Sequence, residues 1–208
     1  MRLLVELAEA LAAPVIDLAS RQNMPTMHPL YQNAQSRALI AQADVILGLE
    51  VTDFWGQVNQ VNRNDKSSRS RLKSGTKTIT IDVNDLYMKS NYQDFQRYAP
   101  VDLAISGDGE ATLPALVEAV RAQMSTERRA SLAPRLERFR RQHAEAREAA
   151  RQAAAFGWDA SPVSTARLCM ELWQAIKAED WALVSVGASE GFVSNWPHRL
   201  WNFDRHYR

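Results

Sequence analysis

Apolar residues in the first half of the chain alternate between helical spacing and the short runs typical of buried strands. Leucine and alanine recur at i, i+3, i+4 and i+7, which predicts an amphipathic helix over residues 2–13. Helical spacing returns over residues 35–43. Four short apolar runs predict strands, at residues 15–18, 45–49, 77–83 and 101–105. Because strands and helices alternate, we expect an α/β fold with a parallel sheet, a Rossmann-like domain over residues 1–124.

The pattern changes after the turn at residues 107–109. A helical stripe follows, and Pro114 fits only its first turn, which predicts Thr112 as the N-cap. Residues 126–156 then carry eight arginines and four glutamates around a thin apolar seam, which predicts a long exposed helix within a linker over residues 125–163. Nucleic-acid binding is the alternative, but no aromatic residues alternate with the arginines to stack on bases.

The tail of the chain predicts an incomplete second α/β domain over residues 164–208. It offers one helical stripe and one strand, from Trp181 to Gly187, and these two elements cannot enclose a core. We therefore expect the tail to leave its tryptophans poorly buried, and the chain to self-associate or to be soluble only when the missing parts are supplied. The tryptophans concerned are Trp173, Trp181, Trp196 and Trp201.

Composition narrows the class of protein only slightly. The 208 residues are 46% hydrophobic and 24% charged, an ordinary globular balance, and the net charge of +1 gives no general attraction to nucleic acid or membranes. Cys169 is the only cysteine, which excludes an intrachain disulfide. No apolar run approaches the ~20 residues of a membrane span, and no signal-peptide layout is present, so a cytoplasmic location is expected.

Candidate chemistry lies at the predicted strand ends. Gly48 and Asp82 each close a strand, and ligands of open parallel sheets bind at the carboxyl ends of strands, so both are candidates for contact with an adenine nucleotide. The alternative is a simple turn at Gly48 and a helix cap at Asp82. Asp108, between two glycines, could hold a Mg²⁺–diphosphate, but the next asparagine is Asn195, so a capped turn is favoured.

Two further sets of residues allow alternative interpretations. A basic run in a serine-rich segment predicts a solvated loop or, alternatively, a loop that binds a phosphate or a coenzyme A tail. It comprises Arg63, Lys66, Arg69, Arg71, Lys73 and Lys77. The four histidines show no metal-ligand spacing. They are His28, His143, His198 and His206.

Five segments carry a family resemblance through their order and spacing. They read LAEALAAPV at 7–15, HPLY at 28–31, ALIAQADVILG at 38–48, ITIDVN at 79–84 and VDLAISGD at 101–108. Together they resemble the central domain of thiamine-diphosphate-dependent enzymes of the acetolactate synthase, 2-oxo acid decarboxylase and hydroxyacyl-CoA lyase type. The resemblance resumes over residues 165–208, where VSVG at 184–187 resembles the strand that opens the cofactor domain of this family.

The resemblance implies a division of the chain and a set of cofactor contacts. Residues 1–124 would be a central domain without its first strand, 125–163 a linker helix, and 164–208 the truncated start of the thiamine-diphosphate domain. In the complete enzyme the cofactors would be thiamine diphosphate and Mg²⁺, with FAD or ADP possible in the central domain beside Gly48 and Asp82. The diphosphate end of the thiamine cofactor would lie near Gly187, Ala188, Ser189 and Glu190.

The function implied is that of a decarboxylase or carboligase acting on a 2-oxo acid or an acyl-CoA-type small molecule. Such an enzyme would be a homo-oligomer with neither nucleic acid nor membrane as a partner. The activating glutamate and the Mg²⁺-binding motif of the family have no match here, so no catalytic or metal-binding residue is expected and the chain would be catalytically incomplete. The alternative is a non-catalytic α/β module that binds an adenine nucleotide (FAD, ADP or coenzyme A) or another subunit.

Overall fold

The computed structural model describes residues 1–18, 22–62, 64–83, 97, 99–181, 183 and 192–204, of which 192–195 are described by their backbone alone. The chain forms two compact units. Unit 1 combines Met1–Ala34 with Gln123–Arg208, and unit 2 is Gln35–Ala122. These units group the residues differently from the ranges expected from sequence, whose assignment to domains of a thiamine-diphosphate enzyme stays a prediction.

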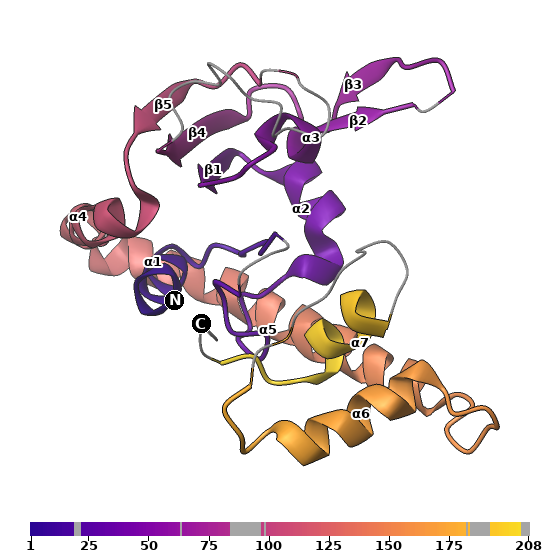
Figure 1. Cartoon of the computed structure of the whole chain (residues 1–208). Coiled ribbons are helices and arrows are strands. Elements are labelled where there is room, and N and C mark those ends of the chain that lie inside the picture. Colours follow the sequence, from indigo (N-terminus) through magenta and orange to yellow (C-terminus); the bar gives the residue numbers. More distant parts are fainter. Residues whose placement is uncertain are drawn as a thin grey trace. The chain divides into compact units, whose positions relative to one another are not determined.

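Unit 2 contains a small parallel sheet of three strands in the order β1-β4-β5 (Figure 1). The strands are β1 (Val45–Leu49), β4 (Lys77–Asp82) and β5 (Leu103–Ser106). In register, Leu47 lies opposite Ile79, and Ile79 lies opposite Leu103. Three of the four predicted strands are therefore confirmed, and the protein is a mixed α/β protein with a small parallel sheet.

Helices α2 (Ser36–Gln42), α3 (Phe54–Val58) and α4 (Gly109–Gln123) accompany this sheet, with a 3-10 turn, η1 (Asn33–Gln35), before α2. The apolar core of the unit gathers around α3. Its buried members are Phe54, Trp55, Val58 and Ala99, and Ile46, Val51, Val61, Leu72 and Val101 pack against them.

The basic segment is only partly a loop. It contains an antiparallel hairpin of β2 (Asn59–Val61) and β3 (Ser68–Ser70). Two of its arginines bond within the unit: Arg69 donates to Gln60 Oε1, and Arg71 Nη1 donates to the Gln57 carbonyl at 3.2 Å. The expected solvated loop was therefore wrong where these strands form, since their backbone groups pair with each other.

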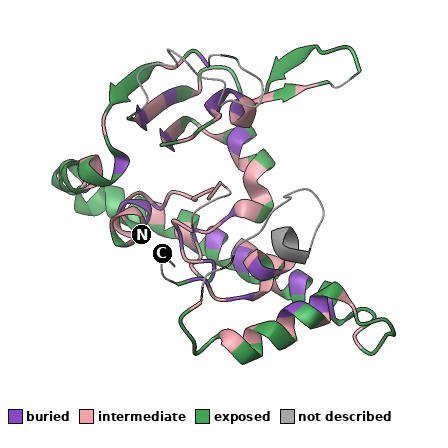
Figure 2. Cartoon of the chain, viewed as in Figure 1, coloured by how far each residue is buried: buried purple, intermediate pink, exposed green. Residues whose placement is uncertain are grey.

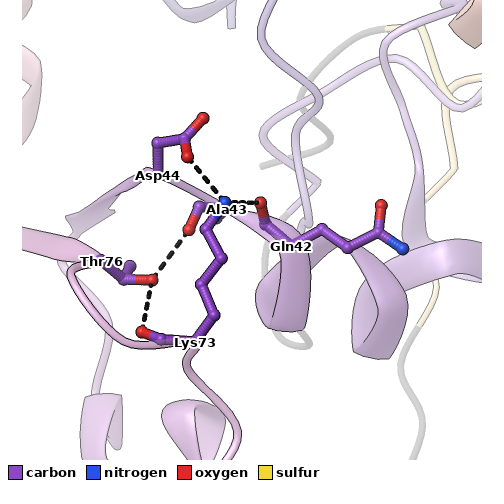
Figure 3. A network of polar contacts seen from close by, with 5 residues as sticks. All are labelled: Gln42, Ala43, Asp44, Lys73 and Thr76. Carbon is purple, nitrogen blue, oxygen red and sulfur yellow. Dashed lines mark hydrogen bonds and ion pairs between the residues drawn. The ribbon is translucent and has the colours of Figure 1, made fainter.

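Lys73 and Thr76 bind the end of α2 (Figure 3). Lys73 Nζ lies 2.9 Å from the Gln42 carbonyl oxygen and 2.6 Å from Asp44 Oδ1, and Thr76 Oγ1 donates to the Ala43 carbonyl at 2.8 Å. An ammonium group at a helix C-terminus is favourable because the helix dipole is negative there. Lys77 Nζ also pairs with a carboxylate, that of Asp102, at 2.7 Å. Both lysines thus have carboxylate partners already, which leaves less positive charge for the phosphate considered from sequence.

Unit 1 is built on helices. They are α1 (Arg2–Leu11), α5 (Thr126–Ala155), α6 (Thr165–Ile176) and α7 (Phe192–Leu200). Helix α5 confirms the predicted long exposed helix, and the Ser125 hydroxyl caps it by accepting from the Arg128 N–H. Its buried positions are four or seven residues apart, so they lie on one side of the helix. They are Phe139, His143, Ala150 and Ala154.

Residues 15–18 do not form the predicted strand. Val15 makes only an isolated parallel bridge with Tyr31. Asp17 instead accepts hydrogen bonds from the Asn23 and Met24 N–H groups, at 2.7 and 2.9 Å. The Asp17 side chain therefore holds the following loop in place. Short polar side chains commonly bond to nearby backbone groups in this way, in competition with the backbone pairing of a strand.

The tail forms an aromatic core in which Trp201 is buried and Trp173, Trp181 and Trp196 are half-buried, so the expectation that these four tryptophans are poorly buried was wrong. Trp201 and Phe203 are 0% and 4% exposed, and Trp173, Trp181, Trp196 and Leu183 pack around them. The Trp201 ring stacks on Trp173 with centroids 5.3 Å apart, and its Nε1–H donates to the Cys169 carbonyl at 3.0 Å. The predicted strand from Trp181 to Gly187 falls mostly outside the described residues.

The segment around Thr26 supplies the partner that the tail alone could not provide. Thr26 is 1% exposed, and its backbone N–H donates to the Phe203 carbonyl at 3.0 Å. Its hydroxyl donates to the Trp201 carbonyl at 2.9 Å and accepts from the Phe203 N–H at 3.0 Å. Residues from the two ends of the sequence therefore form one core.

Candidate functional site

The candidate site is the edge of the sheet where the three parallel strands end. Asp82 lies opposite Ser106 in the register. Beyond the strands, the Glu50 N–H donates to the Ile81 carbonyl at 2.9 Å, and the Gly107 N–H donates to the Asp82 carbonyl at 3.0 Å. The residues that follow β1 and β5 therefore both bond to the end of β4, where Asp82 is the last strand residue. Of the residues predicted to bind a nucleotide, Gly48 and Asp82 fall within this region.

Gly48 has a packing role in the structure. It lies opposite Thr80, and a Cβ atom at this position would come within 3.0 Å of the Phe54 ring. Only hydrogen at Gly48 lets Phe54 pack this close to the strand. Contact between Gly48 and a cofactor stays a prediction.

We expect Gly48→Ala to lower the free energy of unfolding of unit 2 by about 1–3 kcal/mol, because the added methyl group overpacks the core against Phe54. Urea denaturation followed by far-UV circular dichroism measures this. Gly107→Ala is the matched control: its nearest obstacle is the Thr112 hydroxyl at 3.3 Å. Equal stabilities of the two variants would contradict a packing role for Gly48.

Two carboxylates occupy the start of α4. Glu50 Oε1 accepts from the Gly109 N–H at 2.9 Å, and Asp108 Oδ1 accepts from the Ala111 N–H at 2.7 Å. Asp108 therefore caps the helix, as the capped-turn interpretation proposed. The predicted N-cap at Thr112 was wrong, because α4 begins earlier and the Thr112 hydroxyl donates to the Asp108 carbonyl.

Glu50 was not anticipated from sequence. Its backbone is left-handed, with φ of 48°, a conformation that costs a non-glycine residue about 1–2 kcal/mol. This turn brings its carboxylate to the N-terminus of α4, where the helix dipole favours negative charge. The only sequence signal was an acidic residue directly after a strand.

The chemistry of this edge is acidic. Asp53 caps α3 by accepting from the Gly56 N–H at 2.9 Å, so α3 and α4 both begin on carboxylates. Those carboxylates bind N–H groups that a phosphate would otherwise use. Among the described residues, no three His, Cys, Asp or Glu side chains are placed to hold a metal ion. The edge is therefore suited to groups that donate hydrogen bonds, such as hydroxyls.

The other predicted cofactor-binding residues are Gly187, Ala188, Ser189 and Glu190. All four lie outside the described residues, so their contact with a cofactor stays a prediction. Cys169 offers no nucleophile, because burial raises the pKa of its thiol to about 11 and keeps it protonated near neutral pH.

Unit 1 holds a buried histidine on α5. His143 Nε2 lies 2.9 Å from the Thr26 carbonyl oxygen, to which it donates. Burial lowers the pKa of His143, and the charges of Arg147 and His28 act in the same direction, whereas the bond to Thr26 opposes them. His28 Nδ1 accepts from the Leu30 N–H, and its Nε2 lies 3.2 Å from Glu9 Oε1.

A lowered pKa in the folded state means that the unfolded chain binds the proton more tightly. Stability is therefore full above the ordinary value of 6.5 and falls as the pH drops below it. We expect the urea midpoint of unit 1, read by tryptophan fluorescence, to fall between about pH 7.5 and about pH 5.5.

In His143→Gln, whose amide can still donate to Thr26, this fall should become smaller. It should not vanish, because burial also lowers the pKa of His198. An identical pH dependence in the variant would show that His143 does not couple protonation to folding.

The class of protein defined by these observations is a mixed α/β protein whose small parallel sheet ends in an acidic edge. No model of a known protein family matches the sequence, and no curated protein matches it. Within the described part of the chain, every helix is too short or too polar to cross a membrane.

Proposed function

We propose that this chain carries part of the Rossmann-like central domain of a thiamine-diphosphate-dependent enzyme of the acetolactate synthase type. One observation supports the proposal most. Three segments of the family resemblance, ADVILG, ITIDV and DLAIS, coincide with β1, β4 and β5, which are adjacent and parallel. This arrangement fits the parallel α/β sheet that the resemblance implies for these three segments. The complete enzyme would decarboxylate or ligate a 2-oxo acid or an acyl-CoA-type molecule in a homo-oligomer, with thiamine diphosphate and Mg²⁺ supplying the carbanion chemistry.

The acidic edge fits one part of an adenine nucleotide. The Asp82 carboxylate, at the end of the middle strand, suits the hydroxyls of a ribose, as acidic residues at strand ends do in dinucleotide-binding folds. The diphosphate fits less well, because Glu50 and Asp108 hold the first N–H groups of α4. If FAD or ADP binds here, its adenosine would contribute more than its phosphates.

Sequencing the gene on both sides of this segment tests the family proposal directly. We expect an upstream domain with the activating glutamate and a downstream Gly-Asp-Gly and asparagine motif in the same frame. The isolated chain, mixed with thiamine diphosphate, Mg²⁺ and pyruvate, should give no product above a control without protein. Flanking sequence that lacks both motifs, or turnover by the isolated chain, would contradict the proposal.

The second candidate function is a non-catalytic module that binds an adenine nucleotide, and the position of Asp82 favours it. Calorimetry with adenosine, ADP and FAD tests this. We expect adenosine to bind at least as tightly as ADP, and Asp82→Asn to weaken adenosine binding about tenfold. Unchanged affinity in Asp82→Asn would place the nucleotide elsewhere, and absence of binding to the chain would remove this function.

A further inference from the structure

Helix α6 carries more apolar surface than unit 1 covers. One side bears the buried residues Ala166 and Cys169, and Cys169 belongs to the tryptophan core. A second side bears Leu168 and Leu172, one turn apart, which are 49% and 36% exposed. Figure 2 shows exposed positions along the length of this helix.

Two further apolar side chains are exposed in the chain that leads into α6. Val163, just before α6, is 52% exposed, and Phe156, after α5, is 88% exposed. Single exposed apolar residues are ordinary, but two exposed leucines aligned on one helix face are typical of a surface that meets another protein. Leu168 and Leu172 together form the α6 stripe.

We propose that the α6 stripe is a contact between two copies of this chain. In this contact two α6 helices pack antiparallel about a twofold axis, which crosses the helices at the level of Met170 along their length. A twofold contact is self-complementary, so each residue must suit its symmetry mate. With the axis at this place, Leu168 lies level with Leu172 of the second copy, and the two stripes interdigitate.

The charges beside the stripe fit this arrangement. Arg167 and Glu171 are also one turn apart and pair within the helix at 3.6 Å. They flank the stripe on the side away from the buried Ala166 and Cys169. Across the axis, Arg167 lies level with residue 173 of the second copy. The Glu171 of that copy is two residues away, or about 3 Å along the helix. Each copy would thus present a guanidinium to the carboxylate of the other, twice per dimer, whereas a parallel pair would place like charges level with each other.

Two charge variants test the contact between copies apart from the contact within one helix. Glu171→Arg leaves two arginines at these positions, and Arg167→Glu leaves two glutamates. Both variants lose the pair within the helix, and each opposes like charges across its own dimer. Each is expected to be monomeric alone in sedimentation velocity, and an equimolar mixture is expected to form a heterodimer. A mixture that stays monomeric while the unchanged chain dimerises would overturn the proposed geometry.

The apolar contact has its own test, because Arg167 also bonds Asp159 at 3.2 Å and its loss can disturb that loop. We expect the unchanged chain to be in monomer–dimer equilibrium at micromolar concentration. Leu168→Ser with Leu172→Ser should raise the dissociation constant at least about tenfold while the urea midpoint stays nearly unchanged.

Leu103→Ser, at a strand leucine that is 50% exposed, is the matched control and should leave dimerisation unchanged. An unchanged chain that stays monomeric up to high micromolar concentration would overturn the proposal. So would an association that is lost in Leu103→Ser and kept in the double variant, since the sheet would then be the contact.

Discussion

Trp201→Ala is expected to lower the free energy of unfolding of unit 1 by about 3–5 kcal/mol, the largest effect of any single truncation in this core. The side chain is completely buried, and its ring contacts Trp173, Trp181 and Phe203 with centroid distances of 5.3–5.9 Å. Alanine would leave a cavity among these rings and would remove the donor to the Cys169 carbonyl. Loss of this much stability is a large part of what a domain of this size has.

Urea denaturation followed by tryptophan fluorescence measures the effect, because five of the six tryptophans lie in unit 1. Phe156→Ala is the control: an aromatic ring is also removed, but from a position that is 88% exposed, so the change should stay within about 0.5 kcal/mol. If Trp201→Ala and Phe156→Ala have equal effects, the tryptophan cluster does not form a core in solution.

The part of the fold that sequence predicted best is the part in which the pattern is local. The runs predicted at residues 45–49, 77–83 and 101–105 formed β1, β4 and β5, with bounds that differ by at most two residues, because apolar and β-branched residues recur in each short run. Residues 15–18 have a similar apolar run but no strand, because the Asp17 side chain binds the backbone of residues 23 and 24. Residues 15–18 alone do not show that the Asp17 carboxylate will bind N–H groups of residues 23 and 24, so the loop could not be predicted from this segment.

The acidic edge was predicted in position but not in composition. Asp82 is the last residue of β4 and Gly48 lies one residue before the end of β1, as the strand pattern predicted, whereas their contact with a nucleotide stays a prediction. The contribution of Glu50 depends on a left-handed turn and on the Gly109 N–H, 59 residues away in sequence. The hydrophobic pattern of residues 45–50 indicates neither the turn nor this hydrogen bond, so the role of Glu50 could not be predicted from it.

The tryptophan core was missed for the same reason on a larger scale. From sequence, residues 164–208 offered one helix and one strand, and a core needs a second layer. That layer comes from Thr26 and its neighbours and from α5. The hydroxyl of Thr26 bonds to the backbone of Trp201, 175 residues further along the chain. Contacts between residues so far apart in sequence leave no local pattern. Thr26, between Pro25 and Met27, is where the two sequence segments of unit 1 join.

Thr26→Val tests that junction with almost no change of shape. The Thr26 hydroxyl, in a residue that is 1% exposed, satisfies both the Trp201 carbonyl and the Phe203 N–H. Valine replaces it with a methyl group and leaves two buried backbone groups without this partner, each at a cost of about 1–3 kcal/mol. We therefore expect the free energy of unfolding of unit 1 to fall by about 2–5 kcal/mol, measured by urea denaturation with tryptophan fluorescence.

Thr26→Ser separates the hydroxyl from the methyl group of the same residue. Serine keeps the donor and the acceptor and loses only a buried methyl group, so its cost should be about 1 kcal/mol, clearly below that of valine. The reverse order, with serine more damaging than valine, would mean that Thr26 acts through apolar packing. In that case its two hydrogen bonds would not be what joins residues 22–32 to residues 201–203.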